Sequence, residues 1–154
     1  MRRFALLLAA LVLPRLAHAQ SHPLVGEWSV SYVGGMRIEN DERVPITVKG
    51  VLTVALEGDS LVATLKSDPP AGLPAAPTPR PPARFAAKAV DGKVTFIHRS
   101  EATLNMNGQE SKRTAISTYA LEAKADALSG TLMREIEGMD IPVEPQPFTG
   151  TRTK

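Results

Sequence analysis

His98 is the side chain in this sequence best suited to catalysis, because an imidazole can exchange a proton near neutral pH. It stands in a stretch of alternating apolar and polar residues, with Ser100 and Glu101 close behind it. Pointing inward with Phe96, His98 would be placed to accept a proton or to orient a ligand. The structural alternative is a core or rim histidine that is hydrogen-bonded to a neighbour. The sequence leaves this open, since a register change of one residue would turn the ring to the other face.

Other reactive signatures are not found in the chain. There is no cysteine, which excludes thiol catalysis and cysteine-ligated metals. His22 stands far from His98 in a leading tail, so a two-histidine metal site has no support. No nucleophile elbow, zinc-protease motif, phosphate loop or dinucleotide fingerprint occurs. We therefore expect a protein that is not an enzyme and that uses no metal or cofactor.

The first 19 residues are typical of a secretory signal peptide. Arg2 and Arg3 precede the apolar run 4–13, and Ala17-His18-Ala19 provides a small-residue cleavage site. The run is too short for a membrane-spanning helix, and no cysteine follows it to carry a lipid. We expect a leader helix that is removed on export, which leaves a periplasmic or extracellular protein without a stable membrane anchor.

Removal of the leader changes the charge of the protein. Three of the 18 basic residues and none of the 16 acidic ones lie in the leader. Residues 20–154 therefore carry 15 basic and 16 acidic residues. The remaining charges are scattered, and the sequence gives no support to nucleic-acid binding. A length of 135 residues suits a single domain with one core. The lack of disulfides and the Ala-, Arg- and Pro-rich composition favour a bacterial origin.

The stretch 24–33 shows the period-2 alternation of a strand with one buried face, on which Trp28 and Tyr32 lie. Similar alternation predicts eight strands, at 25–33, 44–57, 61–66, 84–90, 93–106, 111–123, 128–136 and 148–152. Gly50 suggests a bulge or a tight bend, 36–43 has the composition of a polar connection, and Asp91-Gly92 and Asn107-Gly108 are typical of two-residue hairpin turns. We expect an all-β protein, an eight-stranded antiparallel up-and-down barrel whose first and last strands pair and so leave no exposed edges.

The segment 67–83 differs from the rest of the chain. It contains seven of the 13 prolines, and proline lacks the donor that a sheet ladder needs. We expect a proline-rich loop inserted between two strands, as a surface insertion, as a lid over the end of the barrel, or as a docking segment for a protein partner.

Gly26-x-Trp28 on the first strand and Arg152 after the last resemble the ends of the lipocalin-like, or calycin-type, small barrels. The resemblance implies that Gly26 and Trp28 lie at the closed end, with Arg152 packed across the indole by a cation–π contact. The pattern Phe148-Thr149-Gly150-Thr151-Arg152 is also similar to a recurrent bacterial secreted domain that opens with Gly-x-Trp and ends with Phe-x-Gly-x-Arg. The mid-chain lipocalin motif, the cysteine bridge and the C-terminal helix are not found here.

Three functions remain open from the sequence. The first is a carrier or sensor of a small apolar molecule. Its cavity would be lined by the inward residues Tyr32, Phe85, Phe96, His98 and Tyr119. The second is a protein-interaction or inhibitor module with a solid-packed barrel that uses the proline-rich loop. The third is an enzyme with an unfamiliar site around His98.

Overall fold

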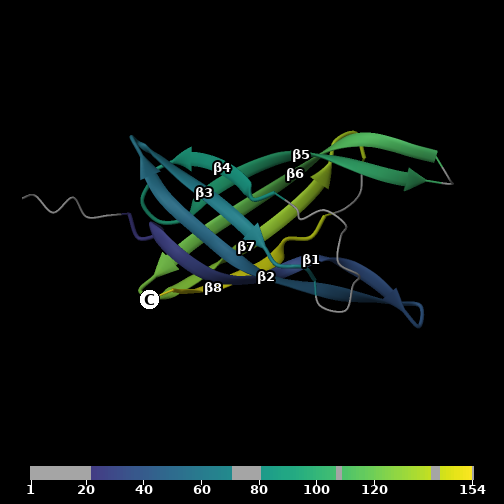
Figure 1. Ribbon diagram of the computed structural model, residues 1–154, viewed down its shortest axis with the longest axis horizontal. Helices are drawn as coiled ribbons and strands as arrows, with labels where there is room; N and C mark the ends of the chain where they lie inside the picture. Colours follow the sequence, from purple (N-terminus) through teal and green to yellow (C-terminus); the bar gives the residue numbers. More distant parts are fainter. Residues whose placement is uncertain (1–21, 71–80, 107–108, 140–142, 154) are drawn as a thin grey trace, which may run out of the picture.

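A computed structural model describes residues 22–70, 81–106, 109–139 and 143–153 of the chain. They form eight antiparallel strands, so the predicted all-β class is confirmed (Figure 1). The strands are β1 (Gly26–Glu39), β2 (Glu42–Glu57), β3 (Ser60–Ser67), β4 (Ala83–Lys88), β5 (Val94–Met106), β6 (Gln109–Lys124), β7 (Ala127–Ile136) and β8 (Gln146–Arg152). The predicted leader and most of the proline-rich loop lie outside the described residues, and the described part contains no helix able to cross a membrane.

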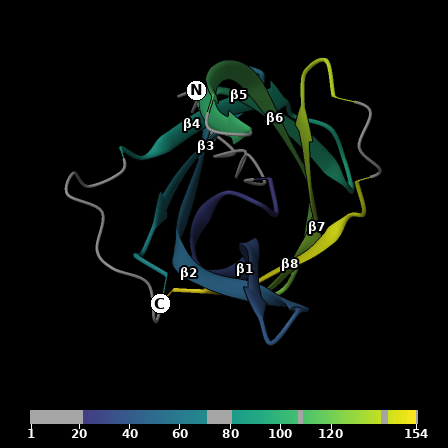
Figure 2. The ribbon, with the colours of Figure 1, turned by 90° about the vertical axis from the view of Figure 1, so that its right-hand side faces the viewer.

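The strands wrap into a nearly closed barrel with the order β4-β3-β2-β1-β8-β7-β6-β5 (Figure 2). The first and last strands pair as predicted, with Trp28 opposite Arg152 and Tyr32 opposite Phe148. Alternate residues of each strand point inward and form one apolar core. Its largest fully buried side chains are Trp28, Phe96 and Phe148.

The barrel has a seam between β4 and β5, where the sequence predicted a hairpin. β4 ends at Lys88 and β5 begins at Val94, and the two strands are not hydrogen-bonded neighbours. Gly92 has a positive φ, but Asp91 does not, so Asp91-Gly92 lacks the geometry of a type I′ turn. Aromatic side chains close the seam instead, with Phe85 of β4 packed against Phe96 of β5. The prediction that closure removes every exposed edge is wrong at this seam.

The segment 36–43, predicted as a polar connection, belongs to a hairpin. β1 continues to Glu39, and Asn40 and Asp41 form the turn with φ of 51° and 64°. Asn and Asp tolerate this left-handed backbone better than other residues with a Cβ. The one register shift between β1 and β2 lies between Val33 and Gly35, and none occurs at Gly50. Gly50 instead allows a close approach, since a Cβ there would meet the Lys66 carbonyl oxygen.

Two pairs of strands extend past the body of the barrel at the same end (Figure 1). The first arm, residues 33–49, is the part of the β1–β2 hairpin that has no third strand beside it. The second arm, residues 101–106 and 109–114, is the corresponding part of β5–β6. We call the end that bears the arms the polar end. Because an isolated two-stranded ribbon is marginally stable in water, the arms depend on the barrel that anchors them.

The opposite end is closed by Trp28 and Arg152. The Arg152 guanidinium lies over the indole, 4.1 Å from its centroid, and the predicted cation–π contact is therefore present. The same guanidinium donates hydrogen bonds of 2.8 Å to the carbonyl oxygens of Val25 and Pro23, while the Trp28 Nε1 donates one of 2.9 Å to Leu24. These bonds hold the chain segment before β1 across the end of the barrel.

We predict that Trp28→Ala lowers the free energy of unfolding by ~3–5 kcal/mol, the range for truncating a large buried aromatic. Urea denaturation measures this loss. Val51→Ala, on the outward face of β2, is the matched control and should cost less than ~1 kcal/mol. A loss below about 1 kcal/mol for Trp28→Ala would show that the indole does not support the closed end.

Gly26→Ala should destabilise the protein by ~1–3 kcal/mol, the usual cost of a strained backbone position. Gly26 has a φ of +137°, and a Cβ there would meet Nη1 of Arg152. Gly35→Ala is the control, because its Cβ would come no closer than 4.0 Å to Ile46. Equal unfolding free energies for the two variants would contradict the assigned role of Gly26.

Candidate functional site

The inward aromatic residues predicted to line a cavity lie together in the barrel interior. Tyr119 stacks on Phe85 with centroids 4.8 Å apart, and Phe85 meets Phe96 edge-on at 5.5 Å. Phe148 continues the cluster, stacked on Tyr32 at 5.3 Å and edge-on to Tyr119 at 5.7 Å. All five rings are buried. The middle of the barrel is thus filled by their contacts, and a ligand would lie against the cluster and not within it.

A row of polar side chains lies above the aromatic cluster, toward the polar end. His98 on β5 pairs in register with Ser117 on β6, and Ser117 pairs with Arg134 on β7. One step deeper, the corresponding row is Phe96, Tyr119 and Leu132. We call His98, Ser117 and Arg134 the polar row. Strand alternation places all three on the inward face, because the row lies two residues from the buried one on every strand.

His98 therefore points inward, the orientation that the sequence left open. Its ring is half-buried and lies 5.9 Å from that of Phe85. Glu101, three residues later, falls on the other face of the strand, and its carboxylate binds the Lys112 ammonium at 2.8 Å. The arrangement gives His98 no carboxylate partner from this stretch. Among the described residues, no group of three or more histidine, aspartate and glutamate side chains could hold a metal ion.

Arg134 is the charged member of the polar row. Its Nη1 donates to the carbonyl oxygens of Val33 at 3.1 Å and of Gly34 at 2.9 Å, at the register shift of β1. Its guanidinium carbon lies 5.7 Å from the centroid of the Tyr32 ring. The ion pairs among the described residues do not include Arg134. A half-buried cation whose hydrogen-bond and ring contacts are with uncharged groups remains suited to bind an anion.

Two tyrosine hydroxyls join this set of polar groups. The Tyr32 hydroxyl lies 2.5 Å from the Ser67 hydroxyl at the end of β3. Burial raises the pKa of the Tyr119 hydroxyl, and the nearby positive charge of Arg134 only partly opposes this rise. Tyr119 is consequently neutral at physiological pH and can donate a hydrogen bond.

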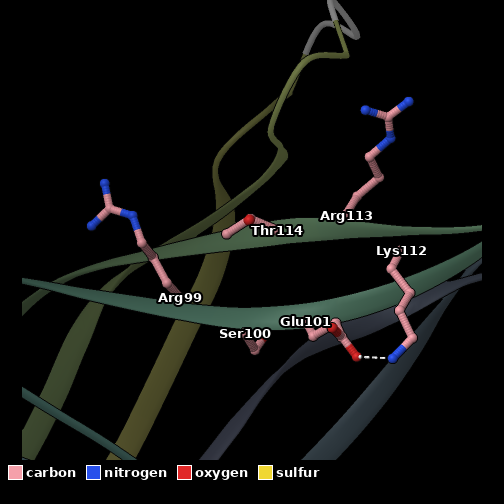
Figure 3. Close-up of a pocket in the computed structure, with 6 residues that line it drawn as sticks. All are labelled: Arg99, Ser100, Glu101, Lys112, Arg113 and Thr114. Atoms are coloured by element: carbon pink, nitrogen blue, oxygen red, sulfur yellow. Dashed lines mark hydrogen bonds and ion pairs between the residues drawn. The ribbon is translucent and has the colours of Figure 1, made fainter.

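A second feature lies at the base of the second arm, where an open hollow of about 360 Å³ is lined by residues of β5 and β6 (Figure 3). The guanidinium groups of Arg99 and Arg113 extend away from the strands, while Lys112 is bound to Glu101 (Figure 3). These side chains are exposed. They lack the apolar wall that the aromatic cluster gives the polar row.

Sequence reasoning missed Arg134, Ser117 and Ser67. The signal for Arg134 is the alternation of β7, in which Arg134 follows Leu128, Gly130 and Leu132 on one face of the strand. Ser117 likewise alternates with Tyr119 and Leu121 on one face of β6. Recognition of the site required the register between β5, β6 and β7, which a single sequence does not disclose.

Neither a protein-family model, nor a curated protein, nor a solved structure matches this chain. The eight-stranded antiparallel, nearly closed barrel is consistent with a lipocalin-like fold. Function is therefore inferred from the chemistry of the polar end.

We predict that the alkaline loss of stability is smaller in Tyr119→Phe than in the unchanged protein. Because the folded-state pKa of Tyr119 is raised, the unfolded chain loses this proton first, and stability falls as the pH rises above ~10. Urea denaturation at about pH 8 and pH 11 measures the difference. Equal losses in the two proteins would show that Tyr119 titrates no differently in the folded state.

Proposed function

We propose that this protein is an exported, non-catalytic, lipocalin-like barrel that binds a small, largely apolar molecule at its polar end. The observation that carries the proposal is the contact between the aromatic cluster and the polar row. Phe85 and Tyr119 offer apolar surface, and the half-buried His98 and Arg134 lie one residue pair above it. A few polar groups converging on apolar surface are typical of small-molecule sites.

The ends of the chain support an assignment to the recurrent bacterial secreted domain with the Gly-x-Trp start and the Phe-x-Gly-x-Arg end. Trp28 and Arg152 are in contact, and Gly26 leaves the space that the guanidinium needs. Such a closed end leaves the other end of the barrel for binding. The proposed compartment, periplasmic or extracellular, follows from the leader sequence.

The second candidate function is a protein-interaction module. It is favoured by the filled interior and by the two arms, whose outer edges carry backbone groups without a neighbouring strand. Such edges can pair with an extended segment of another protein. The proline-rich loop would be a further contact of this module.

Native mass spectrometry of the protein purified gently from the exporting cell tests the first candidate. We expect a reproducible added mass that is lost on denaturation. The Val51→Ala variant, changed on the outer surface, should carry the same added mass. Tyr119→Ala should lose it, because the change removes apolar surface beside the polar row.

A bare mass that matches the cleaved chain would contradict the carrier function. The same purified protein, used as bait with deletion of residues 71–78 as the variant, would then test the interaction module. Loss of partner capture in the deletion variant is the result expected of that second function.

A further inference from the structure

We infer that the polar end binds the carboxylate of an amphipathic ligand, with Arg134 as its charged donor. The inference rests on the proposed function, which it deepens by naming the chemistry of the ligand: a monocarboxylate with an apolar or aromatic tail. Two observations support it: Arg134 lies between the aromatic cluster and the polar end, and no ion pair among the described residues neutralises its charge.

Among the described residues, no ion pair joins Arg134 to a carboxylate. The neighbouring inward side chains are Ser117, Tyr119, Leu132 and Ile136 on the same two strands, and His98 beyond them. Two acids adjoin it along these strands, Glu135 on the outward face and Glu144 just before β8, and both are exposed. The half-buried guanidinium thus lacks the counter-ion that a desolvated cation usually has, and a ligand carboxylate would provide it.

The donors of Arg134 are only partly used by the protein. Nη1 makes both backbone hydrogen bonds to β1, at Val33 and Gly34. A guanidinium has five N–H donors, so Nη2 and Nε are left for other acceptors, the nearby Tyr119 oxygen among them. Two parallel N–H donors fit the two oxygens of a carboxylate. The Nη1 bonds also fix the direction of the group, which lowers the entropy lost on binding.

The surroundings define the rest of the ligand. The Tyr32 ring lies beside the guanidinium, and the Tyr119 and Phe85 rings lie one residue pair deeper. These rings provide an apolar wall for a tail whose carboxylate is held at the polar row. The Arg99 and Arg113 groups of the open hollow could attract an anion, but they offer no such wall. Tight binding of an acid that requires its apolar tail is therefore expected at the polar row and not at the Arg99 and Arg113 hollow.

Isothermal titration calorimetry with decanoate and decanol tests the inference on the purified protein. We expect decanoate to bind about tenfold more tightly than decanol, the effect of one charge-assisted hydrogen bond. Arg134→Gln should remove this preference while leaving decanol binding unchanged. Arg134→Lys, which keeps the charge, should retain part of it. Arg99→Gln is the matched control in the open hollow and should behave as the unchanged protein.

The other outcomes overturn the inference in distinguishable ways. Equal affinity for the acid and the alcohol would refute the carboxylate site and leave the proposed function standing. Loss of the preference in Arg99→Gln would place anion binding in the open hollow of Arg99 and Arg113. Binding of neither probe would contradict the inference together with the proposed function. If Arg134→Gln does not fold, Arg134→Lys takes its place in the titration. A lysine variant that binds acetate as tightly as decanoate would refute a site that requires an apolar tail.

Discussion

The contact between Arg152 and Trp28 is the interaction on which the rest of the structure depends. It joins the first strand of the barrel to the last at the point where their ladder begins. The guanidinium satisfies the carbonyl groups of the segment before β1, and the indole fills the space beneath it. Because one end is closed in this way without disulfides, the opposite end is free to carry polar and half-buried groups.

The two ends of the barrel thus use an arginine for opposite purposes. Arg152 covers an aromatic ring and binds backbone carbonyls, which makes it part of the closed end. Arg134 also binds two carbonyls, but it stands in a row with His98 and Ser117 at the end that the arms flank. The aromatic cluster between them fills the barrel and separates the two environments. A ligand that binds in the barrel interior is therefore expected at the polar end.

Much of the fold was predictable from local patterns. Alternation around Trp28, Phe85, Phe96 and Tyr119 identified the strands and the inward face, because burial on one face imposes a period of two. The pairing of Trp28 with Arg152 followed from the resemblance of the chain ends to a known type of barrel. The hairpin predicted at Asp91-Gly92 was wrong, because a turn sequence does not determine whether the strands that flank it become neighbours. The polar stretch 36–43 around Arg37 was missed because none of its described side chains belongs to the buried core.

The candidate site was predictable only in its apolar half. Tyr32, Phe85, Phe96 and Tyr119 were identified as inward side chains, and the structure places them together. Arg134 was missed because its significance depends on three strand registers and on the carbonyls that the shift in β1 presents. Such long-range geometry is a property of the assembled barrel.

The central claim is that the polar end is the binding surface. A two-dimensional amide NMR titration of the isotope-labelled protein with decanoate tests it most directly. The account predicts chemical-shift changes at Gly34, Ser117 and Tyr119, with Trp28 and the second arm unaffected. Changes confined to residues 101–114, or to the closed end around Trp28, would contradict it.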